Sequence, residues 1–170
     1  MKRATLFPVA ETVTEATLRR PALPKELLAS TAFLLARVGY GIKMRVIAEF
    51  EEAGFTIPQY GVLALLGEGA SETQAKIADI LDYDRSQLVG ELDTLEERGL
   101  VERRRDPHDR RRHMVSITPE GKRQLTKIRA TVKRIEDAFL EPLDEATRKQ
   151  LHATLLDVAC CHDRRYKRDS

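Results

Sequence analysis

The stretch of sequence that decides the fold runs from residue 84 to residue 120 and reads DRSQLVGELDTLEERGLVERRRDPHDRRRHMVSITPE. Asp84 stands at a helix N-cap position, with Gln87 three residues further on. One apolar face then recurs at spacings of three and four residues, as Leu88, Leu92 and Leu95. Gly99 ends the pattern. The first part of the stretch therefore predicts a helix.

After Gly99 the period changes, and the second part of the stretch predicts a hairpin. Residues 100–104 and 113–117 are short strand candidates, and the sequence Asp-Pro-His-Asp at 106–109 between them is typical of a turn. Thr118 and Pro119 then begin the next helix, with threonine as the cap and proline at the first helical position.

Two similar cap patterns lie upstream, at 56–59 (TIPQ) and at 71–74 (SETQ), with the hydroxyl residues Thr56 and Ser71 as the expected caps. They predict helices that carry residues 60–66 and Ile77, Ile80 and Leu81. Only Asp82 and Tyr83 separate the second of these helices from the cap at 84. So short a connection forces two helices to cross sharply, as in a helix-turn-helix. Together with the hairpin, the pattern predicts a winged helix-turn-helix.

Longer apolar stripes flank this region. One contains Leu35, Val38, Ile42, Val46 and Phe50 and ends at Gly54; the other, heptad-like, contains Leu125, Ile128, Val132, Ile135 and Phe139. Pro142 breaks the second stripe, and Asp144 caps a last helix with Leu151, Leu155 and Val158. We interpret the stripes as dimerisation helices, and packing within one chain is the alternative.

The expected fold is mainly α with a small β-hairpin wing. A DNA-binding lobe is expected over 55–118, and a helical dimerisation region over 25–54 and 119–162. An N-terminal arm over 1–24, with a short helix from Val9 to Arg20, and a basic, frayed tail over 163–170 complete the expected organisation.

Charge distribution points to nucleic acid more than net charge does. The 170 residues carry a net charge of only +2, yet six arginines stand against Asp106 and Asp109 within ten residues: Arg103, Arg104, Arg105, Arg110, Arg111 and Arg112. Guanidinium groups fit phosphates and guanine edges bidentately. Recognition helices reach base edges with their N-terminal residues, here Arg85, Ser86 and Gln87. A hairpin beside such a helix places its arginines over the minor groove.

Three segments make a family resemblance specific: ERGLV at 97–101, DPHDRR at 106–111 and VSITPEG at 115–121. With QYGVL at 59–63 they resemble the MarR family of transcriptional regulators, over about residues 30–160. The resemblance implies a homodimer that reads a palindromic double-stranded operator. It further implies a repressor that a small aromatic or phenolic molecule releases from DNA.

By matching positions, the resemblance implies that Arg111 enters the minor groove and that Asp109 holds Arg111 in place. It also implies that Ser86 and Gln87 contact base edges. The full expected DNA-binding set is Gln74, Arg85, Ser86, Gln87, Arg105, Asp109, Arg110, Arg111 and Arg112. Many members of the family have an arginine one turn further along the helix that carries Ser86 and Gln87, but this sequence has Gly90 followed by Glu91. We therefore expect the phosphate or base contact of that arginine to be absent and the middle of the helix to be more flexible. Tyr40, Phe55 and Tyr60 are the candidate ligand residues, with plain core packing as the alternative.

Competing classes of protein have less support. No glycine-rich phosphate loop and no His-Glu-x-x-His occurs, so neither an enzyme nor a cofactor is expected. Cys160, Cys161 and His162 are too few for a zinc site, and these cysteines are expected to be inert. A thiol-based redox regulator, or a winged helix that binds protein instead of DNA, are the alternatives. Neither a signal peptide nor a membrane span is visible, so the expected location is cytoplasmic, without a membrane partner.

Overall fold

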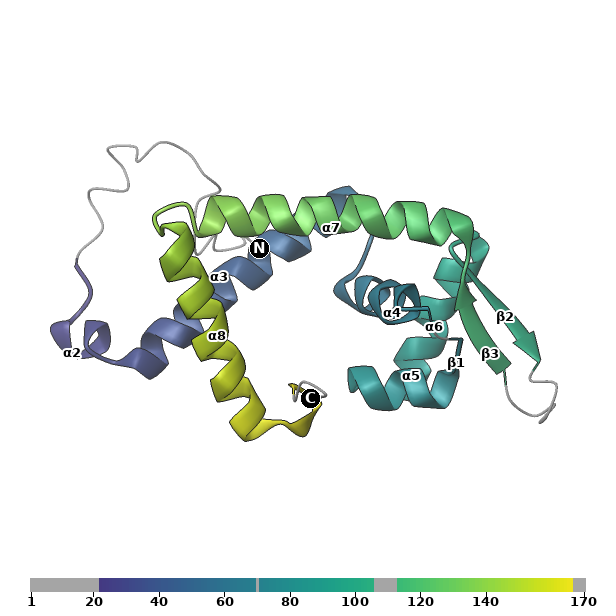
Figure 1. The fold of residues 1–170 in the computed structure, drawn as a ribbon, viewed down its shortest axis with the longest axis horizontal. Helices are drawn as coiled ribbons and strands as arrows, with labels where there is room; N and C mark the ends of the chain where they lie inside the picture. The colour runs from purple at the N-terminus through teal and green to yellow at the C-terminus, as the bar shows by residue number, and fades with distance from the viewer. Residues whose placement is uncertain (1–21, 70, 106–112, 167–170) are drawn as a thin grey trace, which may run out of the picture. The chain divides into compact units, whose positions relative to one another are not determined.

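The computed structural model describes residues 22–69, 71–105 and 113–166. The chain divides into two compact units, residues 1–54 and residues 55–170. Figure 1 labels the helices and strands of both. The helix expected from Val9 to Arg20 lies outside the described residues.

In the first unit, α2 (Lys25–Leu28) leads into the long helix α3 (Thr31–Glu52). The Ser30 hydroxyl caps α3 by accepting a hydrogen bond from the Phe33 amide at 3.2 Å. The helix ends as predicted, since Gly54 directly after the C-cap has a φ of +70°. Large apolar side chains on α3 are 42–50% exposed, namely Leu34, Leu35, Val38, Tyr40 and Met44.

The second unit contains the predicted helix-turn-helix. Helix α4 (Ile57–Gly67) is followed by α5 (Gln74–Leu81) and α6 (Arg85–Glu97). Asp82 adopts a left-handed conformation with φ +57°, and this single residue turns the chain sharply between α5 and α6. The core of this lobe includes Val62, Leu63 and Leu66 of α4, and Leu88, Leu92 and Leu95 of α6, each at most 1% exposed.

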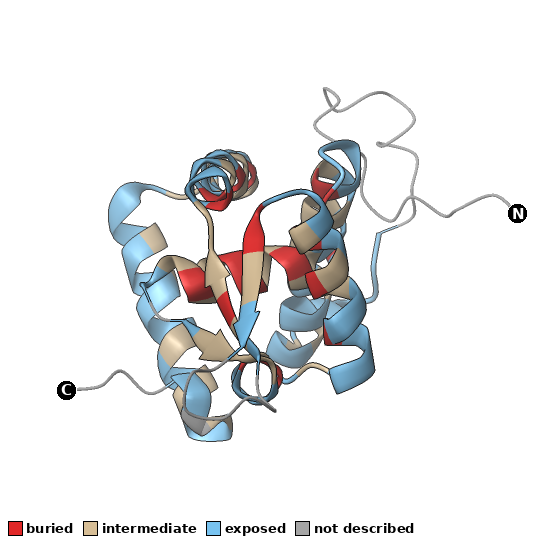
Figure 2. Ribbon diagram, turned by 90° about the vertical axis from the view of Figure 1, so that its right-hand side faces the viewer, coloured by how far each residue is buried: buried red, intermediate tan, exposed pale blue. Residues whose placement is uncertain are grey.

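A three-stranded antiparallel sheet follows, with the strand order β1-β3-β2. Strands β2 (Val101–Arg105) and β3 (His113–Ile117) form the predicted hairpin. The third strand, β1 (Glu72–Thr73), pairs with β3 and was not predicted. Buried residues lie where the strands and the surrounding helices of this unit face one another (Figure 2).

The new strand corrects the expected start of α5. The cap is Thr73, whose hydroxyl accepts a hydrogen bond from the Lys76 amide at 3.2 Å. Ser71, the expected cap, instead donates its hydroxyl to the Val115 carbonyl of β3 at 3.3 Å. The capping pattern at 71–74 is therefore wrong by two residues, because strand pairing occupies residues 72 and 73.

Helix α7 (Pro119–Phe139) begins at the predicted cap Thr118. Leu125, Ile128 and Ile135 of its stripe are at most 4% exposed within a single chain. A Cβ added at Gly67 would lie 2.5 Å from Leu125 Cδ2, so α4 and α7 pack in direct contact. At least the start of the stripe therefore packs within the chain, which is the alternative that the sequence left open, and the role of these helices in dimerisation stays a prediction.

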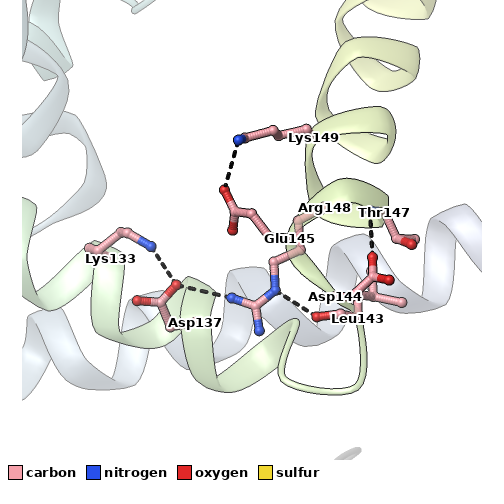
Figure 3. A network of polar contacts seen from close by, with 8 residues as sticks. All are labelled: Lys133, Asp137, Leu143, Asp144, Glu145, Thr147, Arg148 and Lys149. Carbon is pink, nitrogen blue, oxygen red and sulfur yellow. Dashed lines mark hydrogen bonds and ion pairs between the residues drawn. The ribbon is translucent and has the colours of Figure 1, made fainter.

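The turn after α7 is held by a polar network before α8 (Glu145–His162) begins (Figure 3). Arg148 donates to the Leu143 carbonyl at 3.0 Å and to Asp137 at 3.3 Å, and Lys133 pairs with the same Asp137 carboxylate. Asp144 caps α8 by accepting from the Thr147 amide at 2.7 Å. After α8, residues Arg164–Tyr166 form a short 3-10 helix, η1, where a frayed tail was expected.

Candidate DNA-binding surface

The start of α6 presents an ordered, polar first turn. The Asp84 carboxylate accepts hydrogen bonds from the backbone amides of Ser86 at 2.9 Å and Gln87 at 3.1 Å, and also from the Ser86 hydroxyl. The Ser86 hydroxyl bond, followed by the two backbone bonds, lowers the pKa of Asp84. A charged cap thus fixes the positions of the two residues that were predicted to read bases.

The expected contact residues of α6 lie together on its exposed side. Arg85, Ser86 and Gln87 are all exposed, while Leu88 of the same turn is buried. The Arg85 guanidinium lies 3.9 Å from the Asp79 carboxylate, and both side chains are more than 70% exposed. An ion pair this open to solvent contributes little and leaves Arg85 able to bind another anion. Gln74 is half-buried at the first position of α5.

The arginine run does not behave as one surface. Arg103 of β2 is only 21% exposed and turns back onto α6. Its Nε donates to Glu96 at 2.8 Å, its Nη2 donates to Asp93 at 2.6 Å, and its backbone amide donates to Glu96 at 3.0 Å. The Arg103 side-chain bond lowers the pKa of Glu96, even though partial burial opposes this shift. Arg103 therefore joins the hairpin to α6.

The other described arginines of the run point to solvent. Arg104 is 75% exposed and makes a hydrogen bond of 3.0 Å with Glu102, and Arg105 is exposed. Arg105 pairs with His113 in the strand register, which is the last described pair before the tip of the wing. Asp109, Arg110, Arg111 and Arg112 lie outside the described residues, so their roles remain predictions.

Glu91 has a structural role that sequence reasoning missed. Its Oε2 accepts hydrogen bonds from the Thr56 hydroxyl at 3.1 Å and from Gln59 Nε2 at 2.8 Å. Gln59 is 4% exposed, and its other amide atom, Oε1, accepts from the Thr56 backbone amide at 3.3 Å in the predicted capping box. Glu91 thus satisfies a buried amide and ties α6 to the start of α4. The glutamine of the capping box was the only signal in the sequence for this tie.

The three candidate ligand residues have different surroundings. Phe55 is 4% exposed, and the Arg98 guanidinium lies over its ring, 3.9 Å from the centroid. Tyr60 is half-buried on α4. Tyr40 is 45% exposed on α3 and belongs to the other compact unit. The structure therefore brings Phe55 and Tyr60 into one lobe and leaves their role in ligand binding a prediction.

Both cysteines are free thiols near the end of α8. The half-buried Cys160 donates a hydrogen bond to the Tyr166 carbonyl of η1 at 3.0 Å, and Cys161 is exposed. Among the described residues, no three histidine, cysteine or acidic side chains come together to hold a metal ion. None of the described helices has the length and apolar character that crossing a membrane requires.

A winged helix-turn-helix with this surface has clear relatives. A sequence model of the MarR family matches residues 53–112. A protein of Thauera aromatica, described as a candidate transcriptional regulatory protein for the hcr operon, is 30% identical over 145 residues, covering 81% of this chain and 83% of the relative. The chain belongs to the MarR family. Its MarR relatives are transcriptional regulators and not enzymes.

Solved structures agree with this assignment. A MarR-family regulator from Rhodococcus sp. RHA1 is 33% identical, with a TM-score of 0.67, over 82% of this chain and 96% of that chain. CouR from Rhodococcus jostii RHA1, solved with bound p-coumaroyl-CoA, is 35% identical, with a TM-score of 0.64, over 78% of this chain and 94% of that chain. This chain is a MarR-family transcriptional regulator with a winged helix.

Proposed function

We propose that this MarR-family regulator binds a palindromic double-stranded operator as a homodimer, represses transcription, and is released by a small aromatic ligand. The observation that carries the proposal is the exposed first turn of α6, where a charged Asp84 cap fixes Ser86 and Gln87 beside the exposed Arg85. The neighbouring hairpin adds exposed arginines on strand β2.

In this proposal α6 enters the major groove. Gln87 is suited to a bidentate contact with adenine, and Arg85 to a guanine edge or a phosphate. Gln74, at the start of α5, reaches the phosphate backbone. Arg105 and the tip arginines Arg110, Arg111 and Arg112 lie along the minor groove, where negative potential is concentrated, and Asp109 holds Arg111 in place.

A second copy of the chain provides the second α6. Exposed apolar side chains on α3 and on α8 support a homodimer, because single soluble chains rarely expose so many large apolar groups on long helices. Two recognition helices related by a two-fold axis read two half-sites about 34 Å apart.

The proposed ligand is an aromatic acid, a phenol or a coenzyme A thioester of such an acid. Its support is the p-coumaroyl-CoA bound to CouR, and Tyr40, Phe55 and Tyr60 are the residues proposed to contact it. A thermal shift with p-coumarate and with p-coumaroyl-CoA, followed by a DNA-release titration, tests this part. If both compounds leave the melting temperature and the DNA complex unchanged, the proposed ligand class is wrong.

DNA binding is tested by titrations at two or more salt concentrations. The probes are a duplex that the wild-type protein selects from a random library and a scrambled version of the same duplex. Gln87→Ala should reduce the preference for one base at one position of each half-site, a loss of roughly 1–3 kcal/mol of discrimination, with little change in the salt dependence of binding.

Arg111→Ala should weaken binding to all duplexes and lower the slope of log affinity against log salt concentration by about 0.9 for each phosphate that the variant no longer neutralises.

Gln150→Ala, an exposed glutamine on α8, is the matched control for Gln87→Ala and should bind as the parent does. Equal affinity of the parent for selected and scrambled duplex, or no detectable binding to either, would remove the proposal of sequence-specific DNA binding.

A further inference from the structure

Gly90 stands in the middle of α6, and nothing in the described part of the chain requires a glycine there. A Cβ added there would meet no atom within 4 Å, whereas a Cβ at Gly61, Gly67 or Gly121 would lie within 2.8 Å of a neighbouring atom. Its φ is not positive, unlike that of Gly54 or Gly99. Glycine weakens a helix interior relative to alanine. Neither packing nor backbone conformation in the described chain requires this glycine.

Val89, its neighbour, is an apolar side chain on the polar side of the same helix. It is 41% exposed, while the leucines of α6 are at most 1% exposed. Val89 follows Arg85 by four residues and Ser86 by three, so it stands one turn further along the face that carries these two residues. No described part of the chain covers Val89 fully.

The two features form one surface on the first two turns of α6. Ser86 and Gly90, four residues apart, make a strip with little or no side chain. At 100° per residue, Val89 flanks this strip on one side and Gln87 on the other. α6 continues through the glycine, and the Thr94 hydroxyl donates to the Gly90 carbonyl at 3.0 Å. The strip of small residues therefore has an apolar side chain, Val89, along one edge and a polar side chain, Gln87, along the other.

We infer that Val89 reads the C5-methyl group of a thymine in each half-site, and that Gly90 lets α6 approach the base edges closely enough for this contact. The inference rests on the proposed DNA-binding function and adds a base preference to it. In the major groove the thymine methyl is the apolar feature of the base edges, and apolar side chains recognise it by contact. Glycine is the residue that permits a close approach of backbone to a ligand.

The first test exchanges thymine for uracil, which removes only the methyl group. The probe is a duplex that the wild-type protein selects from a random library, with the thymines of each half-site replaced one at a time. At one position the wild-type protein should lose about fourfold in affinity, the effect of about one buried methyl group. Val89→Ala, which removes both γ-methyl groups, should lose clearly less at that position, and Val89→Thr, which keeps one γ-methyl group, should fall between the two.

A thymine-to-uracil loss of the same size in the wild-type protein and in Val89→Ala at every position overturns the inference. The comparison is a double-mutant cycle, so a general effect of uracil on the duplex cancels. A wild-type protein that selects no duplex at all would instead show that the proposed function is wrong, and the inference would fall with it.

The second test uses Gly90→Ala, for which a structural role and a contact role predict different results. The added methyl group meets open space and favours the helix, so the melting temperature should rise. Affinity for the selected duplex should nevertheless fall several-fold. Glu97→Ala, on the same face near the end of α6, adds no atoms and should leave the discrimination between thymine and uracil unchanged. A Gly90→Ala protein that binds the selected duplex as tightly as the wild type does overturns the inference.

Discussion

Arg103 and Arg104 are neighbours on β2, yet they have opposite surroundings. Arg103 is enclosed by Asp93 and Glu96 of α6, and Arg104 is 75% exposed beside Glu102. Alternation along a strand sends successive side chains to opposite faces of the sheet. One arginine of the pair therefore serves the fold, and the other is available to a phosphate.

We predict that Arg103→Ala and Arg104→Ala fail in different ways. Arg103→Ala should lower the free energy of unfolding by roughly 1–2 kcal/mol, because two carboxylates lose a partly buried cation. Arg104→Ala should leave stability within about 0.5 kcal/mol and should lower the salt slope of DNA binding. Chemical denaturation and salt-dependent titration measure the two effects. Equal loss of stability in both variants would contradict the assignment.

Acid pH should weaken the same contact from the side of Glu96. Its pKa is lowered in the folded chain, chiefly by the Arg103 hydrogen bond, so the carboxylate stabilises the fold at pH values above the ordinary glutamate range. That contribution disappears as pH falls through the lowered pKa. The difference in unfolding free energy between wild type and Glu96→Gln should thus be largest near neutral pH and shrink in acid. Glu97→Gln, an exposed neighbour, is the control, and a difference that does not vary with pH would refute the coupling.

At the scale of elements, the sequence predicted those features that depend on hydrogen bonds between residues close together in the chain. The caps at Thr56, Asp84 and Thr118, and the two long strands of the hairpin, follow from contacts between residues close in sequence. Strand β1 could not be predicted, because its two residues pair with β3 more than forty residues away. The partners of Arg103 and Glu91 depend on how helices pack. Periodicity likewise showed the α7 stripe without showing that α4 covers Leu125.

The contact between α6 and α4 gives a prediction of its own. Glu91→Ala should lower the free energy of unfolding by about 2 kcal/mol, because it leaves the buried Gln59 amide without an acceptor. Glu91→Gln keeps an oxygen for that bond and should cost less. Denaturant titration of both variants, with Glu97→Ala as an exposed control, measures the difference. The contact is unimportant if Glu91→Ala is as stable as Glu97→Ala.

At the scale of the whole molecule, the exposed apolar residues of α8 mark where a second copy is proposed to bind. Leu155 and Val158 are 45% and 49% exposed, whereas Leu125 of α7 is 3% exposed within one chain. A charged residue in place of Leu125 would therefore disturb the fold of a single chain. A charged residue in place of Leu155 or Val158 tests the association of two chains.

We predict that replacing Leu155 and Val158 together by glutamate yields a folded monomer that binds the operator weakly. Unpaired charges buried in an interface are strongly unfavourable. Ala146 and Ala153 are exposed on α8 and, at 100° per residue, lie on the side away from Leu155 and Val158; replacing both by glutamate provides the control, and this variant should remain a dimer. Sedimentation velocity distinguishes the two, and a dimeric Leu155/Val158 variant would place the interface elsewhere.

The two ends of the hairpin meet at a cluster of hydrogen bonds around Thr118. The Thr118 amide donates to the Leu100 carbonyl at 3.0 Å, its hydroxyl donates to the Gly99 carbonyl at 2.7 Å, and the same hydroxyl accepts from the Gly121 amide at 3.0 Å. These bonds hold the residues that follow α6 against the start of α7, at the base of the hairpin. Lengthening a loop whose ends are already held costs little free energy. The connection between Arg105 and His113, whose two ends the pairing of β2 with β3 holds in place, can thus change in length and sequence, and regulators built on this scaffold can diverge in the DNA that they prefer while the sheet and the helices stay the same.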